Sequence, residues 1–229
     1  MYIERPMHEK ALVRSVEGSL HTIISGESGN GKSWLYKKVS LDKNWKIFPG
    51  NFSNASRLGS ISDEILNAMV PNGARNLVEH EESINAEFSV AVAKGSGNST
   101  RKYSIKSTEL VEQAFEVGRK EAGHRTAVLV LENLEAIFSR EDLMNELGNI
   151  FLLLDDERYA KHRIKILIVG TPANVIEYYQ NIENLEPVGN RVEEIAHLQS
   201  LKEDQVLTLL KKGFCDQLKV KISDKVLEK

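Results

Sequence analysis

An eight-residue stretch near the amino terminus limits what this 229-residue chain can fold into. Residues 26–33 read Gly-Glu-Ser-Gly-Asn-Gly-Lys-Ser, which matches the phosphate-binding pattern G-x-x-x-x-G-K-[S/T] at every constrained position. Residues 20–25 before it predict a short buried strand, and residues 34–39 after it predict the first turns of a helix. Backbone N–H groups and a helix N-terminus then meet at one place, which favours a polyphosphate anion. The chain is therefore predicted to bind a nucleoside triphosphate.

The residue types within this loop have separate tasks. Lys32 can reach the β- and γ-phosphates, and the hydroxyl of Ser33 can ligate Mg²⁺. The glycines allow close backbone approach and positive φ angles. Trp34 follows the loop directly and is counted with it, although its expected role is to pack the first helix against the sheet. The predicted nucleotide-binding residues of this stretch are Gly26, Glu27, Ser28, Gly29, Asn30, Gly31, Lys32, Ser33 and Trp34.

Composition narrows the class of protein. A hydrophobic content of 41% and a charged content of 28% suit a globular chain with a core. The formal net charge of −3 gives no support to nucleic acid as a partner, although it does not remove that option. No apolar run approaches the roughly 20 residues of a membrane span. One cysteine, Cys215, rules out an internal disulfide. Since no signal-peptide pattern is present, we expect a cytoplasmic protein that makes no membrane contact.

Strand-like and helix-like stretches alternate along the chain, which predicts an α/β fold with a mostly parallel sheet flanked by helices. Residues 126–133 contain a continuous apolar run, which is typical of a strand buried on both faces. Residues 46–50 predict a short strand stopped by its Pro-Gly pair, and residues 191–195 predict a weaker edge strand. Residues 79–104 predict a hairpin or a flexible insertion.

Polar residues follow two of the predicted strands. Because ligands of open parallel sheets bind at the carboxyl ends of the strands, these residues can face the phosphates. Glu132 can hold Mg²⁺ together with Ser33, or it can be a solvated acid that opens the next loop. Thr171 can hydrogen-bond the γ-phosphate or the attacking water, or it can belong to an ordinary Gly-Thr-Pro turn.

Together these segments resemble the AAA+ and STAND branches of the P-loop ATPases, in particular the bacterial relatives of archaeal-type origin-recognition ATPases. Residues 26–33 match the Walker A loop, residues 128–135 stand where the Walker B strand ends, and residues 166–171 resemble the sensor 1 strand. The resemblance covers nearly the whole chain. Walker A is highly specific, whereas the other segments gain weight from their order.

The resemblance also assigns roles to two arginines. Residues 2–5 look like the family stretch that packs near the adenine, so Arg5 joins the nucleotide-binding set. Arg191 lies in a segment that resembles one carrying an arginine and leading into a helical lid. It can act as a finger that reaches the γ-phosphate of a neighbouring subunit, or it can form a surface ion pair at a strand edge.

By the same resemblance, residues 1–199 form the ATPase core and residues 200–229 the start of a helical lid. The tail has one apolar helical face, formed by Val206, Leu207, Leu210 and Phe214. Lids of the family continue for several more helices. We therefore expect either a naturally short lid or a chain excised from a longer protein.

One departure from the family bears on hydrolysis. The family's Walker B strand ends in Asp-Glu, and these positions hold Glu132 and Asn133. Glu132 keeps an oxygen ligand with one more methylene, but the amide of Asn133 cannot accept a proton as a general base. Glu135 lies two residues further and can substitute. The pattern predicts ATP binding with slow or conditional hydrolysis.

Three functions fit these features. The first is an ATP-dependent switch that controls self-association or a partner; the resemblance implies roles in replication initiation, transposition or antiphage defence without selecting one. The second is a small-molecule or nucleotide kinase, against which stands the long spacing between the loop and the Walker B-like strand. The third is a nucleotide-binding pseudoenzyme scaffold.

Overall fold

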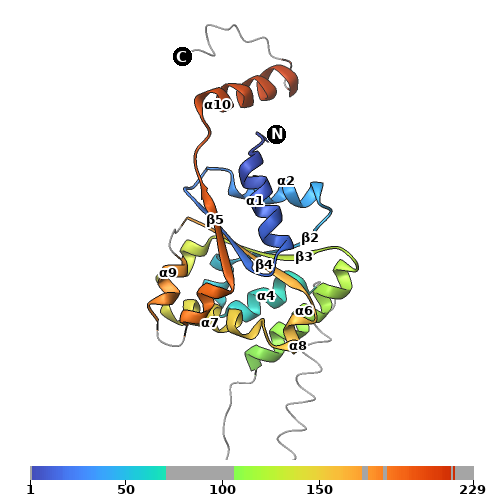
Figure 1. Cartoon of the computed structure of the whole chain (residues 1–229), viewed down its shortest axis with the longest axis vertical. Coiled ribbons are helices and arrows are strands. Elements are labelled where there is room, and N and C mark those ends of the chain that lie inside the picture. Colours follow the sequence, from blue (N-terminus) through green and yellow to red (C-terminus); the bar gives the residue numbers. More distant parts are fainter. Residues whose placement is uncertain (1, 71–105, 172–174, 183–184, 218, 220–229) are drawn as a thin grey trace, which may run out of the picture.

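A five-stranded parallel sheet forms the centre of the protein (Figure 1). The computed structural model describes residues 2–70, 106–171, 175–182, 185–217 and 219. The strand order is β2-β3-β4-β1-β5, and every neighbouring pair is parallel. The strands are β1 (His21–Gly26), β2 (Lys46–Asn51), β3 (Ala127–Glu132), β4 (Ile164–Gly170) and β5 (Val192–Leu198). The predicted α/β class with a parallel sheet is confirmed, and β5 lies at an edge as expected.

Helices cover both faces of this sheet (Figure 1). On one face lie α1 (Pro6–Glu17) and α2 (Lys32–Asp42). The other face is covered mainly by α4 (Ile61–Met69), α6 (Lys106–Ala122) and α7 (Glu141–Leu153). Shorter elements complete the described chain: α3 (Phe52–Leu58), η1 (Leu134–Ala136), α8 (Glu157–Ala160), α9 (Val175–Gln180), η2 (Glu186–Asn190), α10 (Glu203–Leu210) and η3 (Lys211–Gln217). None of the helices in these ranges is both long and apolar enough to cross a membrane.

The continuous apolar run of β3 supplies both faces of the sheet. Ala127, Leu129 and Leu131 belong to the core under α4, α6 and α7. Val128 and Val130 point the other way, into the core under α1 and α2. Side chains alternate between the faces of a strand, so a strand covered on both sides needs an apolar residue at every position. In the sheet, β3 lies between β2 and β4, and its carboxyl end opens at the same edge as theirs.

The strand β2 differs from its prediction. The Pro-Gly pair at residues 49 and 50 does not stop it, because both residues stay in register with Val130 and Leu131 of β3, and the strand continues to Asn51. A proline cannot donate to a sheet ladder, but β2 is an edge strand, so the missing donor faces away from β3. The longer strand brings Asn51 level with Glu132.

The described part of the tail is helical, as predicted. The predicted apolar face is present on α10 and η3, but Val206, Leu210 and Phe214 keep 36–41% of their surface exposed. Figure 1 shows α10 standing away from the sheet, beyond the end of β5. The predicted insertion at residues 79–104 and the end of the tail lie outside the described residues. The division into residues 1–199 and 200–229 stays a prediction.

Candidate functional site

The loop between β1 and α2 has the backbone shape that phosphate binding needs. Gly31 precedes α2 with φ 87°, in the left-handed region that disfavours side-chain-bearing residues. At Gly26 a Cβ atom would lie 2.7 Å from the carbonyl oxygen of Leu198 on β5, so only glycine fits there. Within the described chain no side chain caps α2, and its first N–H groups remain available to an anion.

Lys32 is held by its own loop. Its Nζ donates to the carbonyl oxygens of Gly26 at 2.6 Å and of Glu27 at 2.9 Å. Burial lowers the pKa of Lys32, and the nearby carboxylates of Glu135 and Glu132 partly offset this effect. The ammonium therefore lies inside the curve of the loop and close to two acids.

The carboxylate of Glu132 receives two hydroxyl groups from α2. Ser33 Oγ donates to Glu132 Oε1, and so does the hydroxyl of Tyr36, at 3.3 Å. Ser33 lies at the start of α2, whereas Glu132 ends β3, 99 residues later. The sheet order brings them together, as the Mg²⁺ prediction requires, and an oxygen pair of this kind is what Mg²⁺ uses in phosphate sites.

Asn133 faces the end of β2. Its backbone is left-handed, with φ 64°, and its Nδ2 donates to Oδ1 of Asn51 at 3.1 Å. The same Oδ1 accepts from the backbone of Ser53, while the Asn51 backbone N donates to the buried Glu64 at 2.8 Å. The amide at position 133 is thus fixed by a neighbour and offers no base.

Glu135 and Thr171 lie together across the site. The backbone N of Thr171 donates to Glu135 Oε2 at 3.1 Å, which ties the end of β4 to the turn after β3. Both residues line the same cavity as Lys32. Glu135 is therefore a carboxylate that faces the site where Asn133 has none.

These residues surround a cavity of about 330 Å³ at the carboxyl ends of β1, β3 and β4. The chain brings together most of the predicted site here. The lining residues are Ser28, Gly29, Gly31, Lys32, Ser33, Trp34, Glu132, Asn133, Glu135, Val169, Gly170 and Thr171.

A second cavity of about 200 Å³ adjoins the first and shares Gly29, Gly31 and Trp34 with it. Arg5 lines this cavity and donates to the carbonyl oxygen of Gln199 at 2.7 Å. Its other lining residues are Tyr2, Ile3, Asn30, Leu201 and Leu209.

Trp34 does not pack the helix against the sheet. Its side chain is 58% exposed and contributes to both cavities, whereas Leu35 and Tyr36 carry the buried face of α2. The expected packing role is therefore wrong, because position 34 falls on the outward side of the helix. Its place among the nucleotide-binding positions stays a prediction.

Arg191 is not part of this cluster. Its backbone oxygen accepts from His21 N at 2.8 Å, which places it at the amino end of β1 and β5, the edge opposite the loop. The guanidinium pairs with Asp155 at 2.7 Å and donates to Pro187 O at 2.7 Å. The expected surface ion pair is present, and contact with a neighbouring subunit's nucleotide stays a prediction.

The donor set decides which metal could be held. In the part of the chain that the structure describes, no group of three or more His, Cys, Asp or Glu side chains could hold a metal ion. A cage made of protein ligands alone is therefore not found there. One hydroxyl and one carboxylate beside a phosphate loop fit Mg²⁺, which takes few protein ligands and completes its shell with phosphate oxygens and water.

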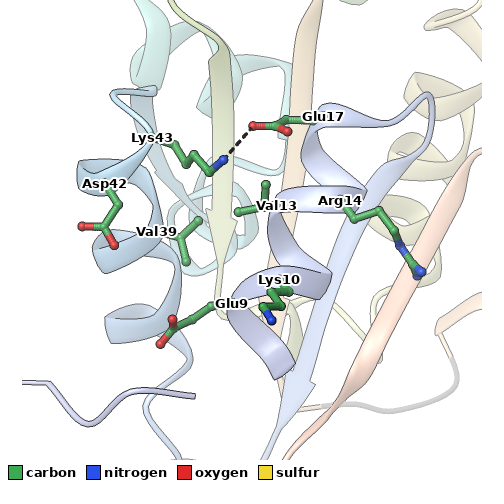
Figure 2. A pocket seen from close by; sticks show the side chains of 8 residues that line it. All are labelled: Glu9, Lys10, Val13, Arg14, Glu17, Val39, Asp42 and Lys43. Atoms are coloured by element: carbon green, nitrogen blue, oxygen red, sulfur yellow. Dashed lines mark ion pairs between the residues drawn. The ribbon is translucent and has the colours of Figure 1, made fainter. Parts of the chain in front are cut away.

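A separate groove of about 490 Å³ lies between α1 and α2, on the outer surface of these helices (Figure 2). Figure 2 shows Glu17 reaching toward Lys43, to which it is joined by an ion pair of 3.6 Å. Arg14 pairs with Glu193, and Asp42 pairs with Lys38. Because these charges already have partners and no loop residue lines it, the groove does not belong to the candidate site.

Sequence reasoning missed two side chains of the site. Tyr36 stands three positions after Ser33, so helical spacing alone put it on the same face. Asn51 is a polar residue at the carboxyl end of a strand. The same criterion, a polar residue directly after a predicted strand, identified Glu132 and Thr171. It was missed because β2 was expected to stop at its Pro-Gly pair.

Comparison with protein families matches residues 14–178, more than half of the chain, to the family described as "AAA domain". The fold is similar to that of a Walker-type ATPase of Pyrococcus abyssi (TM-score 0.61, 16% identity, 99% of this chain and 62% of that one). It is also similar to the ORC2 protein of Aeropyrum pernix in its ADP form (TM-score 0.57, 15% identity, 93% and 53%). No curated protein matches the chain at a significant level.

The chain spans less than two thirds of the length of these two solved structures. At such identities the similarity shows the shared fold, and the family match covers the loop and the ends of β3 and β4. The chain therefore belongs to the AAA domain family of P-loop ATPases.

Proposed function

We propose that this chain binds ATP with Mg²⁺ and acts as an ATP-dependent switch that hydrolyses its nucleotide slowly. The observation that carries the proposal is the convergence of Lys32, Ser33 and Glu132 on one cavity, beside a second one lined by Arg5 and Trp34. A triphosphate suits the first cavity because it has the loop amides and an ammonium. The nucleobase suits the second cavity, which has the aromatic ring of Trp34 and the apolar side chains of Ile3 and Leu201.

Ser33 and Glu132 are the residues that would hold Mg²⁺. The bound ion would supply positive charge to the phosphates. The chain's own part is to place the Ser33 hydroxyl and the Glu132 carboxylate in contact, which their hydrogen bond supports. ATP is proposed over GTP because the sequence has no Asn-Lys-x-Asp guanine motif.

Slow hydrolysis follows from the base that the chain lacks at position 133. The amide of Asn133 is bonded to Asn51 and cannot take a proton. Glu135 faces the cavity, but it already accepts a hydrogen bond from Thr171 N. We infer that Glu135 acts as a weak substitute base and that Asn133 at most positions water.

The route from nucleotide to partner runs through the end of β5. Asn30 of the loop donates to Leu198 O at 2.8 Å, and Arg5 holds the next carbonyl, that of Gln199. Both residues line the second cavity, so these bonds join the segment that leads into α10 to that cavity and, through Asn30, to the phosphate loop. A change at the γ-phosphate would therefore reach α10, whose exposed apolar residues suit a partner or a second copy of the chain. The solved ORC2 structures carry ADP and ADPNP, which agrees with a nucleotide-dependent state.

Phosphate release by the purified chain tests the catalytic half of the proposal. Wild-type turnover should be slow, and Glu135→Gln should lower it further. Asn133→Glu should raise it by about tenfold or more, since it restores a carboxylate at the missing position. Fast wild-type turnover that is abolished by Asn133→Ala but kept in Glu135→Gln would contradict the assignment.

Light scattering with and without ATP-Mg²⁺ tests the switch. A defined increase in mass only when ATP is present supports the switch and the proposal that Arg191 reaches the nucleotide of a neighbouring subunit. The fixed amide of Asn133 favours one other function, a nucleotide-binding scaffold without turnover. A melting temperature raised by ATP-Mg²⁺, with neither phosphate release nor a change in mass, would select that scaffold instead.

A further inference from the structure

Tyr36 stands apart from the other buried tyrosines because its hydroxyl reaches the candidate metal site. Its side chain is 1% exposed and packs in the core between α2 and the sheet. The hydroxyl lies 3.3 Å from Glu132 Oε1, the oxygen that also accepts from Ser33. Ser33 and Tyr36 are three positions apart on α2 and therefore share one face of the helix. One helix thus presents two donors to one carboxylate oxygen.

The two donors have different freedom. The Ser33 oxygen is the group expected to bind the metal ion, so its geometry must follow the ion. The Tyr36 hydroxyl is not expected to bind the ion. Its position is therefore set by its ring, which is buried in the core. The phenol hydroxyl is the donor to Glu132 Oε1, since a carboxylate can only accept. Within the described chain Glu132 Oε2 accepts no hydrogen bond and remains available.

A fixed donor matters because residue 132 is glutamate. The side chain has one more rotatable bond than aspartate, so its carboxylate can take more positions and loses more freedom when it is fixed. A second anchor at Oε1 removes part of that freedom in advance. Pre-organisation of this kind improves affinity without adding a ligand.

We propose that Tyr36 is a positioning residue whose buried hydroxyl holds the Glu132 carboxylate in place for Mg²⁺. The proposal rests on the proposed function, in which Ser33 and Glu132 hold the ion. Tyr36 acts through Glu132 and touches neither nucleotide nor metal. Its removal should weaken the Mg²⁺-dependent part of nucleotide binding and leave the rest unchanged.

Calorimetry with β,γ-methylene ATP separates these two parts. Binding is measured in EDTA and over a series of Mg²⁺ concentrations, for wild type and for Tyr36→Phe. The variant should need about tenfold more Mg²⁺ for half of the full effect, the equivalent of one hydrogen bond to a charged group. Its affinity in EDTA should stay within about twofold of wild type.

Tyr179→Phe is the matched control. Tyr179 is also fully buried, and its hydroxyl donates a single bond, to Met144 O at 3.0 Å. It should lose a similar amount of stability and keep the wild-type Mg²⁺ requirement. An unchanged Mg²⁺ requirement in folded Tyr36→Phe would overturn the proposal, as would an equal loss of affinity with and without Mg²⁺.

A second variant decides the matter if Tyr36→Phe does not fold. Glu132→Asp keeps an oxygen ligand but draws the carboxylate back by one methylene, away from Tyr36. The Mg²⁺ requirement should rise, and an unchanged requirement would overturn the proposal. Failure of the wild-type chain to bind the analogue in Mg²⁺ would instead remove the proposed function itself.

Discussion

At the amino edge of the sheet, polar side chains form hydrogen bonds with nearby backbone groups. At the carboxyl edge, polar side chains line a cavity. Lys165 donates to Gly18 O and Leu20 O, and His21 Nδ1 accepts from Ile166 N at 3.1 Å. A cavity of about 440 Å³ is present at this edge too, lined by His21, Asp155 and Lys165. The presence of a hollow therefore does not separate the edges.

What separates them is how the bonding capacity is used. At the amino edge the charged groups of Lys165 and Asp155 are taken up in closing turns and in an ion pair. At the carboxyl edge Lys32 is bonded only to its own loop, and Glu132 keeps one oxygen without a hydrogen bond in the described chain. The charges of the amino edge are paired within the fold, whereas those of the carboxyl edge line a cavity where the proposed ligand would bind.

Removal of the lysine at the carboxyl edge should have a strong effect on nucleotide binding. Lys32→Ala should weaken ATP binding on the order of 100-fold, because it removes charge-assisted hydrogen bonds to phosphate. The thermal stability of the nucleotide-free chain should change little, since among the described residues Lys32 bonds only to the Gly26 and Glu27 carbonyls. Calorimetric titration with ATP measures the first effect, and thermal unfolding measures the second. Unchanged affinity would remove the basis for the site.

An intermediate effect tests the amino edge through pH. Burial first, and the Lys165 charge second, lower the pKa of His21 to about 3. Since the folded pKa is below the unfolded value near 6.5, protonation favours the unfolded state. The stability from neutral His21 is complete above about pH 6.5 and is lost as the pH falls toward 3.

Between pH 7.5 and pH 5 this group should cost about 2 kcal/mol of unfolding free energy. His21→Asn offers an acceptor near the Nδ1 position and does not titrate. Urea unfolding at both pH values should therefore show a smaller acid loss in the variant. If variant and wild type lose equal unfolding free energy on acidification, His21 is not the group responsible. As a control, the ATP affinity near neutral pH should be the same in both proteins.

The ion pair between Arg191 and Asp155 at the amino edge should contribute only weakly to stability. Asp155→Asn removes the charge opposite Arg191, and the Asp155 side chain is 66% exposed. Exposed pairs contribute little, so the loss should be about 0.5 kcal/mol and should shrink in high salt. Denaturant titration at low and high salt measures it. If Asp155→Asn had normal stability but a large defect in ATP-dependent assembly, the role of Arg191 would be functional rather than structural.

Much of the fold could be predicted because its signals are local. The loop at residues 26–33 specifies its own flanking strand and helix, and the apolar run of β3 announces burial on both faces. The edge position of β5 followed from its mixed composition. These features depend on neighbours in the sequence, which are visible in the sequence itself.

The contacts within the site depend on residues far apart in the chain, and for that reason they could not be predicted fully. Tyr36 meets Glu132 only because β3 and β1 are separated in the sheet by one strand, β4. The exposure of Trp34 depends on how α2 is rotated about its axis. The sequence does not fix that rotation, so the predicted packing role is wrong. Asn51 required knowing that β2 passes through its Pro-Gly pair.

The anchoring of α2 has a consequence for how damage would show itself. Leu35 and Val39 fix the helix to the sheet, and Ser33 rides on the same rigid rod as Tyr36. A slip of this rod carries both hydroxyls sideways by a similar amount. A substitution that loosens the apolar packing of α2 would then be expected to lower Mg²⁺ affinity, even though it lies away from the ligand.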